Sequence, residues 1–444
     1  MEVVVLATFI IGYVAITLEH TLKLDKLIPA LMMMAVCWAT IALNLDSFGQ
    51  WLDPHSGNLM DITSFNHEGR IHLLEGTLLH HFGKTAEILI FLMGAMAIVE
   101  MIDHFDGFSS IKKTIHTNSK RKLLFIVSTL AFVLSAIIDN LTTTIILITI
   151  LRKIIADKND RMWYAGLIII AANAGGAWTP IGDVTTTMLW MAGKVTTVKL
   201  TEYLILPALL CVLVPVIIAS FLPVFKGTME IDHSDDSDQN KYGGLMLILG
   251  LVLIIAVPVF KSITHLPPYV GMMLSLSIFA TVSEILSNRS ISFTNPEADE
   301  HHKGPTMKAL SKIEIPSILF FLGILMTVAS MESLGLIFNF GQQVSAAIPE
   351  SVFVTLLGLA SAVIDNVPLV AASIGMFREG VDAEVWHFIA YAAGTGGSIL
   401  IIGSAAGVVA MGMEKISFFW YLTRISILAL LGYLAGIGMF LLLV

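Results

Sequence analysis

Long apolar runs alternate with short polar connections along most of this chain. The apolar runs approach the ~20 residues that a helix needs to cross a bilayer. They predict full spans near 2–18, 25–45, 85–105, 163–193, 202–224, 243–260, 268–287, 315–337, 386–412 and 417–442. The pattern therefore predicts an all-α polytopic membrane protein with about ten transmembrane helices. A transmembrane β-barrel is disfavoured, because it would show short alternating segments instead.

Two further apolar segments, 123–156 and 350–377, each fold about a polar centre. The first contains SAIIDN at 135–140 and the second contains SAVIDN at 361–366. The apolar arms beside each centre run ~13–17 residues, so as helices they are shorter than a ~30 Å hydrocarbon core. Two re-entrant helical hairpins, each with its tip near the membrane midplane, fit this pattern better than full crossings.

The basic residues predict the direction from which each hairpin enters. The first hairpin is flanked on both sides by clusters of Lys and Arg, namely Lys112, Lys113, Lys120, Arg121 and Lys122 before it and Arg152, Lys153, Lys158 and Arg161 after it. Both of its ends should therefore be cytoplasmic. The second hairpin follows 338–349, which has no Lys or Arg, and precedes only Arg378, so both of its ends should face outside. This topology places both termini on the outer face.

The topology also predicts an internal duplication. Each half then has five crossings and one hairpin, so the second half is inverted relative to the first, as in many secondary transporters. We expect a first repeat over 1–225, with its hairpin at 123–156 and a broken helix at 163–193. An acidic cytoplasmic linker follows at 226–242. The second repeat covers 243–444, with its hairpin at 350–377 and a broken helix at 386–412.

The hairpin tips carry the first group of candidate site residues, Ser135, Asp139, Asn140 and Thr142. An ionisable residue at membrane depth is costly and marks a functional site by default. Free carbonyls at a helix end, a carboxylate and an amide oxygen together make an oxygen-rich pocket that suits a small hard cation. Capping of the returning helix is the alternative interpretation. The same residue types recur at Ser361, Asp365 and Asn366, which favours the functional one.

The segment NAGGAWTPIGDVTTT, from Asn173 to Thr187, carries the second group. Its Gly and Pro residues can unwind a helix, and unwound backbone is tolerated at membrane depth where it lines a wet cavity. Asp183, Thr185 and Thr186 would add oxygen ligands. A kinked structural helix capped by Asp183 is the alternative.

The segment GTGGSILIIGSAAG, from Gly394 to Gly407, occupies the matching place in the second half. Gly175–Gly176 align with Gly396–Gly397, while Ser404 stands in the place of Asp183. Ser398 and Ser404 are either neutral ligands or residues that hydrogen-bond within their own helix. Glu100 and His104, near the cytoplasmic end of a span, are candidates for pH response or gating, or simply interfacial residues.

Composition excludes several other classes of protein. The chain is 56% hydrophobic and 13% charged, roughly half the ~25% charged residues of a soluble protein. It has no phosphate-binding GxxxxGK[ST] loop, no HExxH motif and no basic, aromatic-interleaved patch. We therefore expect neither an enzyme nor a nucleic-acid binder, and no cofactor.

The blocks SAIIDNLTTT, NAGGAWTPIGDVTTT, SAVIDNVP and GTGGS, in this order, resemble the ion transporter superfamily and, within it, the NhaD-type sodium/proton antiporters. The resemblance covers most of 85–200 and 315–425. It implies a homodimer in the cell inner membrane that exports Na⁺, and commonly Li⁺, in exchange for H⁺ by an elevator-like movement. It also implies a role in pH homeostasis and salt tolerance.

The residue chemistry favours a cation as the transported species. Asp139, Asp183 and Asp365 would repel a di-anion and could each hold H⁺ or Na⁺ but not both, which is the basis of antiport. The Na⁺ ligands would be Asp139, Asn140, Asp365 and Asn366. The alternative is a Na⁺-coupled carrier of a dicarboxylate or another anion. It needs a neutral or basic pocket, and apart from Arg424 the spans contain no basic residue.

Overall fold

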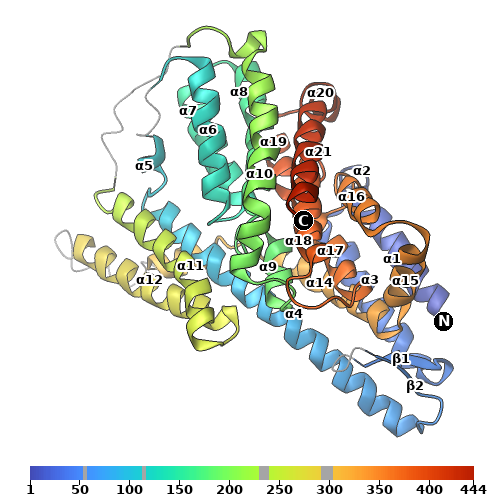
Figure 1. The fold of residues 1–444 in the computed structure, drawn as a ribbon. Coiled ribbons are helices and arrows are strands. Elements are labelled where there is room, and N and C mark those ends of the chain that lie inside the picture. The colour runs from blue at the N-terminus through green and yellow to red at the C-terminus, as the bar shows by residue number, and fades with distance from the viewer. Residues whose placement is uncertain (54–57, 113–116, 230–239, 292–303) are drawn as a thin grey trace.

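A computed structural model describes the chain except for residues 54–57, 113–116, 230–239 and 292–303, and its described part is almost entirely helical (Figure 1). The first half contains α1 (Glu2–Thr17), α2 (Glu19–Leu22), α3 (Leu27–Leu43), α4 (His67–His104), α5 (Ser109–Lys112), α6 (Lys120–Ser135), α7 (Asn140–Ile154), α8 (Lys158–Gly176), α9 (Val184–Met191) and α10 (Thr197–Ser220). The short 3-10 helices η1 (Leu45–Ser47) and η2 (Pro223–Phe225) and the strands β1 (Gln50–Leu52) and β2 (Leu59–Asp61) complete it. The acidic run of the predicted linker 226–242 lies outside the described residues.

The second half continues with helices of similar lengths. It contains α11 (Gly243–Thr264), α12 (Pro268–Ile291), α13 (Pro305–Leu310), α14 (Ile315–Ser333), α15 (Leu336–Ala347), α16 (Glu350–Ala360), α17 (Asn366–Met376), α18 (Glu384–Gly396), α19 (Ala405–Glu414), α20 (Phe418–Arg424) and α21 (Ser426–Leu443). Helices coincide with all ten predicted spans. Within the described residues, six helices are long and apolar enough to cross a bilayer unaided, namely α4, α10, α11, α12, α14 and α21.

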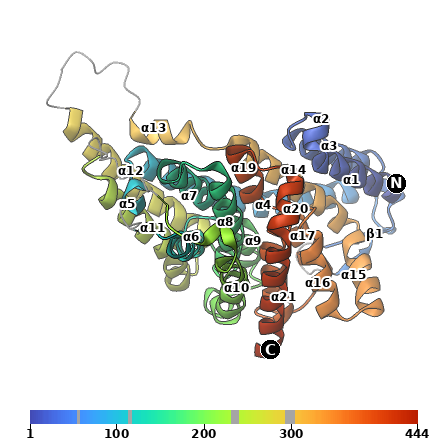
Figure 2. The same cartoon turned by 90° about the horizontal axis from the view of Figure 1, so that it is seen from above.

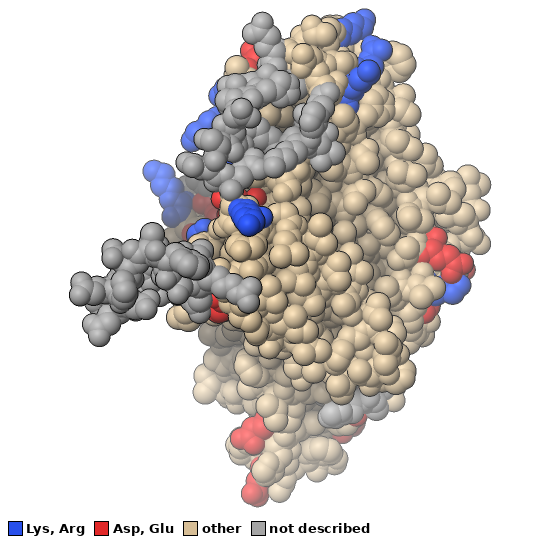
Figure 3. Space-filling model, turned by 90° about the vertical axis from the view of Figure 1, so that its left-hand side faces the viewer, with Lys and Arg blue, Asp and Glu red and all other residues tan. Residues whose placement is uncertain are grey.

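The outer surface of these helices is apolar, as a lipid-facing surface must be. On α11 the exposed large residues Leu245, Ile248, Val252, Ile255 and Val259 recur every three or four positions and form one stripe. Figure 3 shows the side of the molecule that carries α11 and α12, where a broad surface without charged side chains lies between charged residues at its edges. The protein is therefore a polytopic all-α membrane protein.

Helix α4 is much longer than the predicted span 85–105. It has 38 residues, which corresponds to about 57 Å, more than the ~40–45 Å of a bilayer with its headgroups. Its first turn is capped by Asn66, whose side chain accepts a hydrogen bond from Gly69 N at 2.9 Å. The polar residues before the predicted span, from His67 onward, are therefore part of the same helix. Hydropathy detects only the part of a helix that lies in lipid, and here the polar part continues into water.

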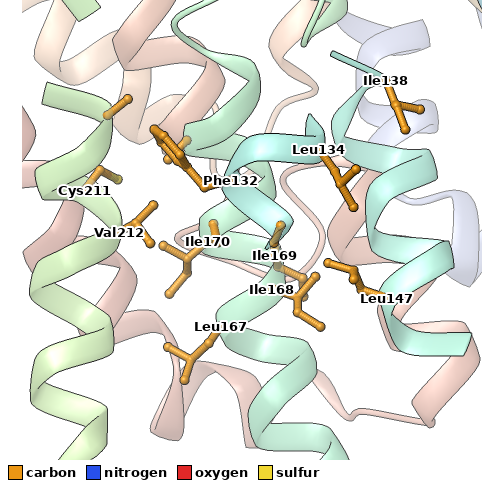
Figure 4. Packing of buried hydrophobic residues seen from close by; sticks show 14 of the residues in the cluster. Phe132, Leu134, Ile138, Leu147, Leu167, Ile168, Ile169, Ile170, Cys211 and Val212 are labelled. Carbon is orange, nitrogen blue, oxygen red and sulfur yellow. The ribbon is translucent and has the colours of Figure 1, made fainter. Parts of the chain in front are cut away.

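The two predicted hairpins are present as helix pairs that turn at the IDN residues. Helices α6 and α7 are joined by residues 136–139, and α16 and α17 by residues 361–365. Both predicted broken helices are also interrupted, α8–α9 at residues 177–183 and α18–α19 at residues 397–404. Figure 4 shows Phe132, Leu147, Ile168 and Val212 filling the space between α6, α7, α8 and α10. Cys211 packs in the same core, as a small apolar side chain.

Glycines let each hairpin approach its broken helix closely. A Cβ atom on Gly175 of α8 would overlap the carbonyl of Phe132 in α6. A Cβ atom on Gly396 of α18 would likewise overlap the carbonyl of Gly358 in α16. The two halves therefore use the same close backbone contact at equivalent positions.

Serine hydroxyls reinforce these two contacts. Ser135 Oγ donates to the carbonyl of Ala172 at 2.5 Å, and Ser361 Oγ donates to the carbonyl of Ala393 at 2.8 Å. Each hydroxyl thus joins the end of an incoming hairpin helix to the neighbouring broken helix. Both serines are fully buried.

The helices form two groups that meet along α4 and α14. The hairpin group consists of α6–α10 and α16–α21, which pack mainly on one another. The frame group consists of α1, α3, α4, α11, α12 and α14, with α1 against α3, α3 against α14, and α4 against α12. In Figures 1 and 2, α11 and α12 lie on one side of the hairpin group and α1 and α3 on the other. Contacts of α14 with α17 and of α4 with α9 join the two groups.

A buried ion triad ties the hairpin group together at the end away from the hairpin tips. The Glu414 carboxylate at the end of α19 accepts from Arg152 Nε at 2.7 Å and from Arg161 Nε at 3.1 Å. Its side chain is 1% exposed. The triad therefore connects α7, α8 and α19, which come from both halves of the chain.

We expect Glu414→Ala to lower the apparent melting temperature of the purified protein in detergent. It leaves the half-buried Arg161 without its partner, a loss on the order of 3 kcal/mol. The control is Glu202→Ala, which breaks an exposed pair with Lys199 and should change stability by less than about 1 kcal/mol. Equal melting temperatures for the two variants would show that the triad does not stabilise the packing.

Candidate functional site

The tip of the first hairpin is organised by Asp139. This residue is the N-cap of α7, and its carboxylate accepts from Thr142 N at 2.7 Å and from Thr142 Oγ1 at 2.9 Å. Its φ is 128°, a region that favours glycine and strains other residues. Capping and ion binding are therefore compatible roles for Asp139, because its partly buried carboxylate also lines the cavity described below.

The tip of the second hairpin is organised by Asp365, the N-cap of α17. Asp365 Oδ1 accepts from Val367 N at 3.2 Å, and Oδ2 lies 3.4 Å from Lys26 Nζ. Lys26 is the residue before α3, and its ammonium also lies 4.4 Å from the centroid of the Phe320 ring on α14. Asp25 Oδ1 instead accepts from the backbone N–H of Leu27 at the start of α3.

Asp183 lies between the two tips and links them. It caps α9 through a hydrogen bond from Thr185 N to Oδ1 at 3.0 Å and is 3% exposed. Its other oxygen, Oδ2, accepts from Asn140 Nδ2 at 3.2 Å and from Asn366 Nδ2 at 3.4 Å. One carboxylate from the broken helix is thus held by an amide from each hairpin.

Asn173 and Ser404 extend this network to the second broken helix. Asn140 Nδ2 also donates to Asn173 Oδ1 at 2.9 Å, and Asn173 Nδ2 donates to Ser404 Oγ at 3.0 Å. Ser404 Oγ accepts from Gly407 N at 3.2 Å and so caps α19. Ser404 therefore performs the capping role that Asp183 performs in the first half, without a charge.

A cavity of about 100 Å³ lies where the two tips and the α8–α9 break face the frame group. Its polar lining includes Asp139, Asn140, Thr142, Asp183, Thr187, Ser317, Asp365, Asn366 and Lys26. Its opposite wall is largely apolar and includes Phe91 and Leu92 of α4 and Phe321 of α14. Water takes up roughly 30 Å³ per molecule, so the cavity has room for an ion with part of its hydration shell.

The charges that line this cavity do not balance. Among the described residues, three carboxylates face it, from Asp139, Asp183 and Asp365, against the single ammonium of Lys26. All the carboxylates and amides belong to the hairpin group, whereas Lys26 precedes α3 of the frame group. No group of three or more His, Cys, Asp or Glu in the described part of the chain is arranged to hold a metal ion. The Asp183 carboxylate is instead held by the amides of Asn140 and Asn366.

The remaining predicted residues lie beside the cavity without lining it. Thr186 Oγ1 donates to the carbonyl of Asp183 at 2.9 Å, and Ser398 Oγ, just after the end of α18, donates to the carbonyl of Thr395 at 2.7 Å. Ser135 and Ser361 make the interhelical hydrogen bonds described above. Thr185 Oγ1 is buried, and within the described residues it has no hydrogen-bond partner.

Two larger cavities lie on either side of this centre. One of about 300 Å³ follows α7 from Lys153 to Thr142 and is also lined by Glu100 of α4. The Glu100 carboxylate lies 3.9 Å from Lys312 Nζ. The other, of about 320 Å³, follows α17 from Ala371 to Arg378. We call them the α7 vestibule and the α17 vestibule; His104, the last residue of α4, lines neither.

Sequence reasoning missed Lys26, the basic residue of this lining, as well as the neutral Thr187 and Ser317. Lys26 lies at the edge of the predicted span 25–45, so the expectation that the spans contain no basic residue apart from Arg424 is wrong. Arg424 is exposed at the end of α20, while Lys26 lines the cavity. The sequence indicates Lys26 by its position directly before an apolar helix. The pairing with Asp365, 339 residues away, is not visible in any local pattern.

Comparison with known proteins gives consistent matches. Residues 13–387 match the family described as citrate transporter. The chain is 38% identical to "Sodium/proton antiporter 1" of Arabidopsis thaliana, over 99% of this chain and 72% of that one. It is 31% identical to "Na(+)/H(+) antiporter NhaD" of Alkalimonas amylolytica, over 98% of this chain and 89% of that one. The YdaH transporter of Alcanivorax borkumensis shares the fold, with a TM-score of 0.56 and 14% identity over 93% and 97% of the two chains.

The two vestibules predict opposite accessibility to a membrane-impermeant thiol reagent. Thr149→Cys, in the α7 vestibule, should react in everted vesicles and not in right-side-out vesicles, because the basic residues beside that hairpin predict that its ends are cytoplasmic. Ile374→Cys, in the α17 vestibule, should show the reverse. The native Cys37 and Cys211 should react little with the reagent, because both are buried. Reaction of both variants from the same side would contradict this topology.

Proposed function

The chain belongs to the citrate transporter family and, within it, to the NhaD-type sodium/proton antiporters, and on that basis we propose that it exchanges Na⁺ for H⁺ across a membrane. It is a transporter and not an enzyme. One observation carries the proposal: three carboxylates line a small cavity between two helical hairpins, and among the described residues the Lys26 ammonium alone opposes them. Such a cavity attracts cations and repels di-anions.

The exchange follows from competition at the carboxylates. Burial disfavours the charged form of a carboxyl group, and a nearby cation favours it. A carboxylate that is neutralised by H⁺ cannot also hold Na⁺, so the two ions exclude each other. Asp139, Asp183 and Asp365, with the amide oxygens of Asn140 and Asn366, would then bind one species at a time. Li⁺ is a second small hard cation that suits the same oxygen donors.

The apolar wall explains why the site would move only when it is neutralised. Phe91, Leu92 and Phe321 face the carboxylates across the cavity. Moving an uncompensated charge along such a surface costs several kcal/mol or more. The occupied site avoids most of this cost, which couples movement to binding.

The division into two helix groups supports an elevator-type movement. The hairpin group carries all the carboxylates and amides of the site, and the frame group supplies the opposing wall. We infer that the hairpin group moves against the frame group, so that the site opens in turn to the α7 and the α17 vestibule. The equivalent serine and glycine contacts in the two halves support two inverted repeats as the origin of the two access states.

A Na⁺-coupled anion carrier is the alternative, and Lys26 is the one residue that favours it. Its ammonium could face a carboxylate substrate. However, Lys26 is already paired with Asp365 at 3.4 Å, and Asp139 and Asp183 leave the cavity negative. We therefore favour cation exchange, in a cell inner membrane, by a homodimer with both chain termini outside.

We expect Asp139→Asn, Asp183→Asn and Asp365→Asn each to reduce exchange by about tenfold or more, equivalent to about 1.4 kcal/mol or more of lost cation interaction. Everted vesicles from an antiporter-deficient host would be energised to acidify their lumen. A fluorescent ΔpH probe would then follow the response to NaCl, LiCl or KCl.

Asp46→Asn, in an exposed ion pair with His67, is the matched control. If the three site variants retained wild-type exchange, the proposed site would be wrong. If the wild type responded to no alkali cation, radiolabelled dicarboxylate uptake would test the alternative.

Competition predicts a specific pH dependence. As the pH falls, the apparent KM for Na⁺ should rise, approaching about tenfold for each pH unit where the carboxyl groups are mostly protonated. The maximal rate at saturating Na⁺ should change much less. The same vesicles, assayed over a range of NaCl concentrations at several pH values, provide the measurement. A maximal rate that collapses at an unchanged KM would indicate separate sites for the two ions.

A further inference from the structure

Lys26 is the one charged side chain among those lining the cavity that does not come from the hairpin group. It lies directly before α3, which packs on α14. Its ammonium is held from two sides, by Asp365 Oδ2 at 3.4 Å and by the face of the Phe320 ring at 4.4 Å. The pair therefore bridges the frame group and the tip of the second hairpin.

The ammonium occupies the place where a cation bound to Asp365 would lie. Asp365 Oδ1 is used by the backbone of α17, so Oδ2 is the oxygen that faces a ligand, and Oδ2 is the oxygen that Lys26 contacts. A bound Na⁺ and the Lys26 ammonium would repel each other at this distance. Binding at Oδ2 therefore requires the ammonium to move.

A second, smaller cavity lies beside Lys26 and gives the ammonium somewhere to go. Its volume is about 70 Å³, and its lining includes Tyr13, Thr17, Glu19, Lys26 and Asp365. Tyr13 Oη is buried and, within the described residues, has no hydrogen-bond partner. The four-carbon stem of a lysine lets its ammonium swing between neighbouring acceptors. Tyr13 Oη and the Glu19 carboxylate are the acceptors that this cavity offers to the ammonium.

We propose that Lys26 is a built-in competitor of the transported cation, which pairs with Asp365 when the site holds no Na⁺ and swings toward Tyr13 and Glu19 when Na⁺ binds. This inference rests on the proposed exchange of Na⁺ for H⁺. The titratable groups that face Asp365 are Tyr13 of α1, Glu19 of α2, Lys26 before α3, Asp139 at the first tip and Asp183 at the α8–α9 break. Lys26 is the cationic member of this set, so its removal changes both the competition and the charge balance.

Replacing Lys26 should therefore strengthen Na⁺ binding, which a purely structural residue would not do. In Lys26→Gln, the apparent KM for Na⁺ at alkaline pH should fall about fivefold or more, because no ammonium competes at Oδ2. The onset of activity should shift by about one unit toward alkaline pH, because the carboxyl groups lose a nearby positive charge and hold protons more tightly. Lys26→Arg keeps the charge and should not lower the KM. Lys23→Gln, at an exposed position three residues earlier, is the matched control and should behave as wild type.

Tyr13→Phe tests the swing. It removes a hydrogen-bond acceptor for the displaced ammonium, so the KM for Na⁺ should rise, opposite in direction to Lys26→Gln. In the double variant Tyr13→Phe with Lys26→Gln, the tyrosine change should have no further effect, because the two residues act as one unit. Additive effects would show that the two residues act independently, and would overturn the swing.

Binding is also measured without transport, as the rise in melting temperature of the purified protein with NaCl at constant ionic strength set by choline chloride. The half-maximal NaCl concentration should be lower in Lys26→Gln than in the wild type. If Lys26→Gln does not fold, Lys26→Met keeps the apolar stem over Phe320 and serves in its place. Suppose that the wild type exchanges Na⁺ for H⁺ and that a folded Lys26 variant keeps the wild-type KM and pH profile. That result would overturn the role of Lys26 and leave the proposed function standing. Absence of exchange in the wild type would instead overturn the proposed function.

Discussion

The cost of an unpaired charge next to an apolar surface is the constraint on which this structure depends. Asp183 is almost fully buried, and the protein compensates its carboxylate with two amides and a helix N-terminus. Asp139 and Asp365 are compensated by their own helix caps and, for Asp365, by Lys26. None of these partners cancels the charge completely, and in the proposed exchange the remaining negative charge attracts the cation. The proposed binding and the proposed movement would then share one electrostatic origin.

The backbone supplies the geometry that this compensation requires. Main-chain N–H groups can hold a buried carboxylate only where a helix begins, and α7, α9 and α17 begin at Asp139, Asp183 and Asp365. The close contacts of Gly175 and Gly396 bring the broken helices against the hairpins. In this way residues that are far apart in sequence, such as Asn140, Asp183 and Asn366, come to share one hydrogen-bonded network.

The sequence predicted those parts of the structure that have a local cause. A polar Asp-Asn centre marked both hairpins and clustered glycines marked both helix breaks, so these four features could be placed to within a few residues. The 38-residue length of α4 could not be predicted, because a polar helix in water and a polar loop have similar hydropathy. Lys26 was missed for a different reason. Its role depends on a contact between the two halves of the chain, and no periodicity or motif near residue 26 encodes its partner.

The backbone at Asp139 has an evolutionary consequence. A φ of 128° costs a residue other than glycine on the order of 1–3 kcal/mol, so the fold alone would prefer glycine at this position. Drift toward glycine would relax the turn and stabilise the protein while removing the carboxylate. The aspartate can persist only while selection on its chemistry outweighs this pull. Asp139 therefore trades backbone stability for a carboxylate in the cavity.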